Sequence, residues 1–507
     1  MSARNSHDIE VGKAHVDNVE DVSDAVANAN KPNPQKEAPA YVAGLSPEER
    51  IEAEKRLVRK IDMRLLPMII IMYIMNYLDR NNIATARLAG LPQDLNLQGN
   101  QYQTAVSILF VGYLLMQIPS NLMLNKFGKP ALYLPIAMIL WGIISTATAA
   151  AQSFAGLVVI RFFLGFVEAA YFPGCLYFLS AWYTRKELGF RTAALYSGSL
   201  ISGAFSGLIA AGITNGMEGK LGLRAWRWLF IVEGAITIVI AIAAIFILPN
   251  FPRTTSWLSE EEKQLATWRL EEDIGEDDWV DSEQQSFLHG CKLAFTDIKT
   301  WVLMLMILCI VSSASVTNFF PTVVETLRFG TIETLLLTAP PYCLAVISAF
   351  ANAWHADRTG ERYWHVTLPL YVSVVAFIIA ATTTSVAPRY VSMMLMVPSF
   401  YAGYVVALGW ISNTLPRPAS KRAAALAGIN CVSNASSIYA SYMYPDDQAP
   451  RFIAAMSVNC ATAFIAILAA TVLRFMLVRL NKRLDRGEGV GQGVPGQAGS
   501  RGFRFLV

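Results

Sequence analysis

Four ionisable residues lie inside otherwise apolar stretches of the sequence: Asp79 and Arg80 in the first stretch, and Arg161 and Glu168 in a later one. A charge at the centre of a hydrocarbon layer costs roughly 2.5–3.5 kcal/mol, so such a residue usually has a partner and a task. A guanidinium stays charged and binds a carboxylate through two parallel hydrogen bonds. A carboxylic acid removed from water can bind and release a proton near neutral pH. These residues therefore predict a site that binds an organic anion through its arginines and protons through its acids.

The spacing of the four residues predicts that they surround one cavity. Arg161 and Glu168 are seven residues apart, which is two helical turns, so both point from one helix face about 10 Å apart along the axis. Counted from the ends of their stretches, Asp79, Arg80 and Arg161 lie at similar depth, with Glu168 nearer the middle. If one acid competes with the anion for an arginine, proton binding and anion binding are linked. The alternative is that two structural ion pairs hold the two helices together.

Polar residues in other apolar stretches are candidates for the rest of the cavity wall, although each could instead make a hydrogen bond between helices. They are Asn76, Tyr77, Gln117 and Tyr196 in the first half of the chain, and Asn318, Trp410, Asn413, Asn430 and Asn434 in the second. Glu233 lies near the end of its stretch, where we expect it to pair with Arg227.

The composition indicates that the helices carrying these residues cross a membrane. Of the 507 residues, 54% are hydrophobic and 16% are charged, whereas a soluble protein has about 25% charged residues. A helix needs about 20 mostly apolar residues to cross the hydrocarbon core. Such stretches lie near residues 65–88, 104–124, 131–151, 155–181, 193–213, 229–249, 301–321, 335–354, 366–385, 390–412, 424–444 and 453–473. We therefore predict an all-α membrane protein with twelve transmembrane helices.

Charge and composition also divide the chain into parts. Lys and Arg are enriched in the cytoplasmic loops of membrane proteins. In this sequence they are more frequent in the loops that lie on the same side of the membrane as the two termini, which predicts that both termini are cytoplasmic. We expect the membrane to be the plasma membrane. We expect the acidic loop 250–297 to be a solvated tether, with one amphipathic cytoplasmic helix around Leu265, Trp268 and Leu270 as the alternative. We expect residues 1–45 and 487–507 to be disordered because they are polar or Gly-rich. The expected parts are an N-terminal tail (1–60), a six-helix bundle (61–249), the linker (250–297), a second bundle (298–480) and a C-terminal tail (481–507).

Other chemistries are not indicated by the sequence. The five histidines show no metal-ligand spacing, and no Gly-rich phosphate loop with a trailing Lys is present. The net charge of +3 gives no indication of a nucleic-acid partner. No nucleophile with a base and an orienting group can be identified. We therefore expect no enzyme, no metal and no cofactor, and transport that is driven by gradients.

Ordered motifs along residues 50–480 carry a resemblance to a known family. They include Asn76-Tyr77-Leu78-Asp79-Arg80-Asn81-Asn82-Ile83, Gln117-Ile118-Pro119-Ser120-Asn121, Arg161-Phe162-Phe163-Leu164-Gly165-Phe166-Val167-Glu168-Ala169 and Arg227-Trp228-Leu229-Phe230-Ile231-Val232-Glu233-Gly234. With these motifs the sequence resembles the major facilitator superfamily and, within it, the fungal anion:cation symporters related to allantoate and nicotinate permeases.

The resemblance implies two pseudosymmetric six-helix bundles that give alternating access to a central cavity. Related organic-anion symporters use an Asp-Arg pair in the first helix and an Arg with a Glu two turns later in the fourth, matching Asp79, Arg80, Arg161 and Glu168. By this analogy the arginines serve the anion and the gate, and the acids carry protons. Two short basic turns in equivalent places of the two halves would form the gate through Asn125, Lys126, Gly128, Asp357, Arg358 and Gly360. Asn125 stands where the superfamily usually has Asp.

Three functions are compatible with these features. The first is proton-coupled uptake of a small organic anion, such as a heterocyclic or aliphatic carboxylate, by a monomer in the lipid bilayer. The second is export of an acidic secondary metabolite by the same fold, since the direction of flux follows the gradients. The third is a nutrient sensor with the fold of a transporter.

Overall fold

The computed structural model describes residues 38–127, 129–275, 287–415, 419–486 and 504–507. The chain divides into two units, Met1–Ile51 and Glu52–Val507. In the first unit the short helix α2 (Ala40–Ala43) precedes the start of α3 (Pro47–Leu88). Ser46 and Glu49 cap α3 reciprocally, each backbone N–H donating to the other side chain, at 2.9 and 3.3 Å. The expected disorder of residues 1–45 is therefore wrong for 38–45, and residues 1–37 lie outside the described residues.

Helices account for nearly all of the described part of Glu52–Val507. The first half continues from α3 with α4 (Leu91–Asp94), α5 (Gln101–Phe127), α6 (Pro130–Ala147), η1 (Thr148–Ala150), α7 (Phe154–Glu168), α8 (Tyr171–Ser180), α9 (Arg185–Met217), η2 (Lys220–Gly222) and α10 (Ala225–Ile247). Between the halves lie α11 (Glu260–Gly275) and α13 (Phe287–Thr296). The second half contains α14 (Ile298–Ser313), η3 (Ala314–Phe319), α15 (Phe320–Glu325), α16 (Thr331–Leu337), α17 (Ala339–Thr359), α18 (Tyr363–Thr382), α19 (Val386–Thr414), α20 (Ala419–Ala440), η4 (Ser441–Met443), η5 (Asp446–Gln448) and α21 (Ile453–Asp485).

Each predicted apolar stretch coincides with helix to within a few residues. Among the described residues, 10 helical segments are long and apolar enough to cross a membrane. The predicted stretches 104–124 and 424–444 are the two without a counterpart in this set, and they form α5 and α20. No strand occurs in the described residues. The prediction of an all-α membrane protein is confirmed.

Prolines explain where the predicted helices break. Stretch 155–181 forms two helices, α7 and α8, because Pro173 has no N–H to donate to the carbonyl of Ala169, four residues earlier. Pro321 has the same effect on the carbonyl of Thr317, where stretch 301–321 tightens into the 3-10 helix η3. Both interruptions lie deep inside apolar stretches, where neighbouring helices can satisfy the freed backbone groups.

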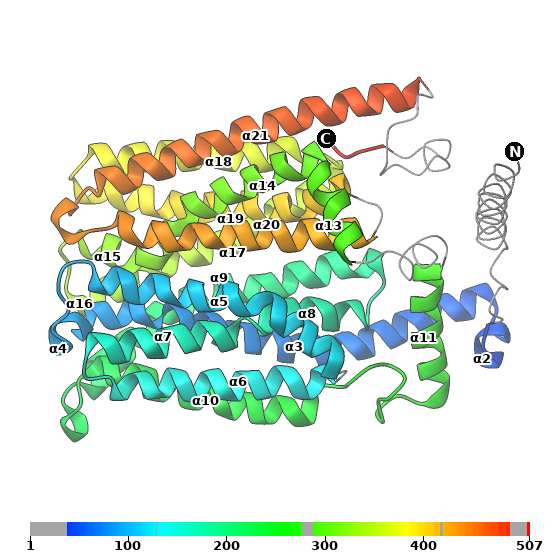
Figure 1. The fold of residues 1–507 in the computed structure, drawn as a ribbon, viewed down its shortest axis with the longest axis horizontal. Helices are drawn as coiled ribbons and strands as arrows, with labels where there is room; N and C mark the ends of the chain where they lie inside the picture. The colour runs from blue at the N-terminus through cyan, green and yellow to red at the C-terminus, as the bar shows by residue number, and fades with distance from the viewer. Residues whose placement is uncertain (1–37, 128, 276–286, 416–418, 487–503) are drawn as a thin grey trace, which may run out of the picture. The chain divides into compact units, whose positions relative to one another are not determined.

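The two halves of Glu52–Val507 meet along α9, where two glycines permit close approach. A Cβ atom at Gly207 would lie 2.4 Å from the carbonyl oxygen of Leu335, and one at Gly203 would lie 2.4 Å from the ring of Tyr342. Small residues let helices pack this closely in lipid. The contact lies towards the end of the molecule where α4 and α16 are found, which we call the far end; α11 lies at the opposite, linker end (Figure 1).

Helix α11 docks against the first half. The buried guanidinium of Arg269 donates to Glu187 at 3.0 Å and to the carbonyl of Trp182 at 2.7 Å, and Lys60 pairs with Glu262 at 2.7 Å. Burial alone would raise the pKa of the Glu262 carboxyl, but the hydrogen bond from Lys60 holds it below its ordinary value. Residues 260–275 therefore form an anchored helix, as the alternative of an amphipathic helix predicted, and the solvated tether is wrong for this part of the linker.

Asp297 fixes the start of the second half. Its carboxylate accepts the backbone N–H of Lys299 at 3.0 Å as the N-cap of α14, and accepts Lys421 of α20 at 2.6 Å. Burial alone would raise the pKa of Asp297, but the bond from Lys421 and the charge of Lys299 hold it below its ordinary value. The linker-end tips of α14 and α20 are thus joined by one carboxylate.

We expect Gly207→Ala to weaken the contact between α9 and α16, because the added methyl group would overlap the Leu335 carbonyl. Overpacking of this kind costs about 1–3 kcal/mol, so the thermal unfolding midpoint in detergent should fall. Gly212→Ala on the same helix is the matched control, since no atom lies within 4 Å of its added Cβ. Equal midpoints for the two variants would contradict this close packing.

Candidate functional site

A cavity lies between the two halves of Glu52–Val507, and its wall consists mainly of aromatic rings and side-chain amides. The rings are those of Tyr73, Tyr77, Phe110, Tyr113, Phe172, Tyr196, Tyr342, Phe400, Tyr401 and Tyr404, and the amides those of Asn76, Asn81, Asn318, Asn430 and Asn434. Arg80 is the charged residue among the described residues of the wall. Of the predicted site residues, the wall brings together Asn76, Tyr77, Arg80, Tyr196, Asn318, Asn430 and Asn434.

Arg80 and Glu168 form an ion pair at the edge of the cavity. Both Nε and Nη2 of Arg80 donate to the same carboxylate oxygen of Glu168, at 3.1 and 3.0 Å. The Arg80 side chain is 12% exposed and that of Glu168 is fully buried, so the guanidinium faces the cavity and the carboxylate lies behind it. The guanidinium carbon also lies 5.2 Å from the ring centre of Tyr77 and 4.9 Å from that of Tyr113. The aromatic rings and the carboxylate together fix the orientation of the one cationic group on this wall.

Arg161 lies behind the wall rather than on it. Its side chain is almost fully buried, Nε donates to the carbonyl of Ala105 at 3.4 Å, and Nη1 has no hydrogen-bond partner. Glu168, two turns further along α7, keeps its second oxygen without a hydrogen-bond partner as well. Arg161 thus adds positive charge near Glu168 and is not among the residues of the cavity wall.

Asp79 points away from Arg80, into the interior of the first half. It is fully buried and accepts hydrogen bonds from Ser145 at 2.8 Å, Thr237 at 2.8 Å and Trp141 at 3.2 Å. Consecutive residues of an α-helix point about 100° apart, so neighbours in the sequence face different helices. None of the other three residues joins Arg80 on the described part of the cavity wall: Glu168 lies behind its guanidinium, Arg161 lies behind the wall, and Asp79 lies between α3, α6 and α10. The expectation that all four surround one cavity is therefore wrong.

Glu233 is a functional candidate that the sequence analysis misassigned. The expected pair with Arg227 is absent, because six residues along a helix place the two side chains about 120° apart; Arg227 pairs with Asp94 at 2.9 Å instead. Glu233 is fully buried and interacts electrostatically with Asp79, and Asn82 is the neighbour that can hydrogen-bond to its carboxyl group. The sequence does contain a signal for this position, because Glu233 and Thr237 are four residues apart and so lie on the same face of α10. Thr237 donates to Asp79, so this face meets Asp79.

Two predicted wall residues and the predicted gate lie elsewhere. Gln117 and Trp410 are buried outside the cavity wall. The second turn of the predicted gate lies between α17 and α18, where Gly360 ends α17 with φ +68°. Asp357 pairs with Arg362 at 2.7 Å, and Arg358 lies 5.4 Å from the ring centre of Trp354. In the first turn, the side chains of Asn125 and Lys126, and the whole of Gly128, lie outside the described residues.

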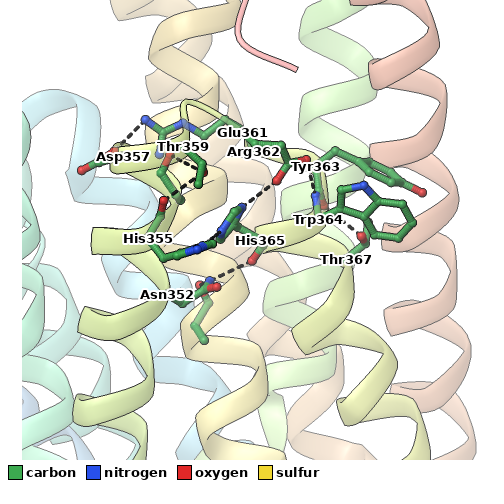
Figure 2. A network of polar contacts seen from close by, with 12 residues as sticks. Asn352, His355, Asp357, Thr359, Glu361, Arg362, Tyr363, Trp364, His365 and Thr367 are labelled. Atoms are coloured by element: carbon green, nitrogen blue, oxygen red, sulfur yellow. Dashed lines mark hydrogen bonds and ion pairs between the residues drawn. The ribbon is translucent and has the colours of Figure 1, made fainter.

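A polar network supports the second turn. Figure 2 shows His365 between Glu361 and His355: Nδ1 of His365 lies 2.6 Å from Glu361, and Nε2 lies 2.6 Å from Nδ1 of His355. Asn352 donates to the carbonyls of His365 at 2.8 Å and of Ala402 at 2.9 Å. These bonds tie the end of α17 to the start of α18 and to α19.

Comparison with known proteins gives one consistent result. The profile of the Major Facilitator Superfamily matches residues 69–441. The MFS-type transporter cnsO of Penicillium expansum is 34% identical over 445 residues, which cover 85% of each chain, and the major facilitator-type transporter hxnP of Emericella nidulans is 30% identical over 89% of this chain and 91% of its own. The proton:xylose symporter XylE has a similar fold, with a TM-score of 0.62 at 16% identity over 82% of this chain and 95% of its own.

The three hydrogen bonds to Asp79 give a prediction about stability. Ser145→Ala combined with Thr237→Val removes two donors from a fully buried carboxyl group, which costs about 1–3 kcal/mol for each unsatisfied group. The thermal unfolding midpoint in detergent should therefore fall clearly. Thr382→Val is the matched control, because this exposed hydroxyl bonds only to carbonyls of its own helix. A double variant as stable as the control would show that Asp79 does not depend on these donors.

Proposed function

Because this chain belongs to the Major Facilitator Superfamily, we propose that it carries a small organic anion together with protons, by symport through alternating access. That the chain is a membrane transporter and not an enzyme follows from the family and from its transporter relatives. The anion and the proton coupling are inferred from the site. The observation that carries them is the ion pair in which Arg80 faces the cavity and Glu168 lies behind it.

The ion pair of Arg80 and Glu168 links binding of the organic anion to binding of the proton, because both depend on the Arg80 guanidinium. A buried charge left without a partner is strongly unfavourable, so Arg80 is bound either to Glu168 or to an anion in the cavity. A proton on Glu168 removes the competing charge and leaves two N–H donors of Arg80 free for the carboxylate of the substrate. Anion binding and protonation of Glu168 therefore favour each other, which is the requirement for symport.

Asp79 and Glu233 offer a second position for a proton, away from the cavity. Three donors stabilise a charged Asp79, whereas Glu233 interacts electrostatically with Asp79 and meets Asn82. Two buried carboxyl groups that interact are less unfavourable when one of them carries a proton, so this pair offers a place to hold one. We propose proton-coupling roles for Asp79 and Glu168, as the sequence predicted, and for Glu233.

The wall suits a flat or compact carboxylate. Aromatic rings stack on heterocycles and also enclose aliphatic groups, while the amides of Asn76, Asn318 and Asn430 supply directional hydrogen bonds. This supports the proposed relation to allantoate and nicotinate permeases. Uptake across the plasma membrane, with both termini cytoplasmic, completes the proposal.

Alternating access would use the contacts at the two ends of the molecule. The packing of α9 against α16 and α17 closes the far end, and we assign this end to the outside. The halves 61–249 and 298–480 would rock about the cavity, with the turn of Asp357, Arg358 and Gly360 meeting the first half when the linker end closes. Asn125, Lys126 and Gly128 are the proposed counterpart in the first half.

Substitution Glu168→Gln tests the coupling. The amide mimics the protonated acid, so anion exchange should continue while net proton-driven accumulation is lost. The measurement uses proteoliposomes with an internal pH dye, challenged with a panel of carboxylates that includes nicotinate and allantoate. Parent protein should acidify the interior only when an accepted anion is added, and the variant should not. Acidification by the variant at the parental rate would rule out Glu168 as the coupling acid.

Substitution Arg80→Gln tests the anion site. Loss of a charge-assisted pair of hydrogen bonds costs about 1.5–3 kcal/mol, so the affinity for an accepted carboxylate should fall roughly tenfold to a hundredfold. Binding can be followed by ligand-dependent thermal stabilisation. Arg56→Gln is the matched control, since the Arg56 side chain is 71% exposed and pairs only with Glu52 on its own helix. Parental affinity in Arg80→Gln would move the anion site elsewhere.

A further inference from the structure

Residues 504–507 are ordered against the second half, although the sequence analysis expected disorder throughout 487–507. Phe505 is 3% exposed and belongs to the same apolar cluster as residues of α13, α14, α19 and α21. In Figure 1 the segment lies by the label C, beside α13 and near α21. Residues 487–503 lie outside the described residues. A segment that buries a large aromatic ring in the core of a bundle is a structural element rather than a loose tail.

The segment is held by bonds to its backbone. Asn481 of α21 binds Phe505 twice, accepting its N–H and donating to its carbonyl, both at 2.9 Å. The indole of Trp410 donates to the carbonyl of Leu506 at 3.0 Å, and the N–H of Arg362 donates to the carbonyl of Val507 at 3.0 Å. These bonds would be made equally by any extended peptide whose aromatic side chain fits the apolar pocket.

The groups that bind the segment need such a partner. The Trp410 side chain is fully buried, and a buried indole N–H usually finds an acceptor. The N–H of Arg362 lies at the start of α18, where the first N–H groups of a helix have no partner within the helix. The segment thus satisfies polar groups at the linker end that would otherwise be unbonded.

The binding position adjoins the turn between α17 and α18. Arg362, which donates to Val507, also pairs with Asp357 across that turn, and Leu506 lies against Gly360. On another side, Lys299 of α14 lies 5.0 Å from the ring centre of Phe505. One short segment therefore connects the turn to α14, α19 and α21.

We propose that the surface of α14, α18, α19 and α21 at the linker end is a peptide-binding site, and that its ligand is the chain's own segment Arg504–Val507. The ring of Phe505 packs into the apolar cluster of the bundle, and Asn481, Trp410 and the N–H of Arg362 make hydrogen bonds to the backbone of the segment. Occupancy holds the turn of Asp357–Arg362 in one position relative to the bundle, and release of the segment leaves this turn free to move. The site therefore regulates the mobility of the turn, whichever substrate the cavity accepts.

Hydrogen exchange of the full-length protein, read by mass spectrometry, tests this site. In the parent, the amide of Phe505 should exchange at least about tenfold more slowly than in an unstructured peptide, because it is bonded to Asn481. Asn481→Ala should abolish this protection, and Phe505→Asp should speed exchange across residues 357–366. Arg56→Gln is the control, because the Arg56 side chain is 71% exposed, pairs with Glu52 on its own helix and lies outside the proposed site.

A second arm separates loss of docking from loss of folding. The synthetic peptide Arg-Phe-Leu-Val, added to the Phe505→Asp variant, should restore slow exchange at residues 357–366, while exchange in α5 and α10 stays at the parental level throughout. Exchange of the parental segment at the rate of an unstructured peptide would overturn the proposal. Parental exchange of the turn in Phe505→Asp would overturn it as well, and so would failure of the peptide to slow the turn.

Discussion

The ion pair between Arg80 and Glu168 is the interaction on which the chemistry of the cavity depends, because it couples a guanidinium at the cavity wall to a buried carboxylate. Glu168 accepts two hydrogen bonds from Arg80 and is shielded from the cavity. The guanidinium can exchange Glu168 for an anion only if the carboxyl group is neutralised, because a charged carboxylate without a partner is strongly unfavourable. A proton is the simplest agent that neutralises it. The chemistry of the cavity therefore follows from one ion pair and its asymmetric exposure.

The surrounding helices make that asymmetry possible. Glu168 ends α7 immediately before the break that Pro173 imposes, so the carboxylate sits where the backbone is no longer continuous helix. On the opposite side of the cavity, the 3-10 helix η3 presents Asn318 to the same space. Close packing at Gly207 brings the two halves together at the far end. Interrupted helices and close contacts through small residues thus place polar groups at mid-depth without exposing backbone to lipid.

The sequence predicted most of the fold, because apolar length alone identifies helices that cross a membrane. It also identified the acids and arginines of the site, since a charge inside such a helix is conspicuous. It did not predict which way each one faces: Asp79 and Arg80 are neighbours, yet one meets α6 and α10 and the other meets the cavity. The predicted pair of Glu233 with Arg227 is wrong because six residues turn a helix by about 600°, which points the two side chains about 120° apart. Phe505 could not be predicted, since its pocket is formed by helices distant in the sequence.

The central claim is that binding of an anion to Arg80 brings a proton to Glu168. Titration calorimetry of an accepted carboxylate, repeated near neutral pH in buffers of different ionisation enthalpy, counts the protons taken up on binding. The account predicts an uptake approaching one proton for each anion bound, with affinity that weakens as the pH rises. Binding without proton uptake, at an affinity that does not change with pH, would contradict it.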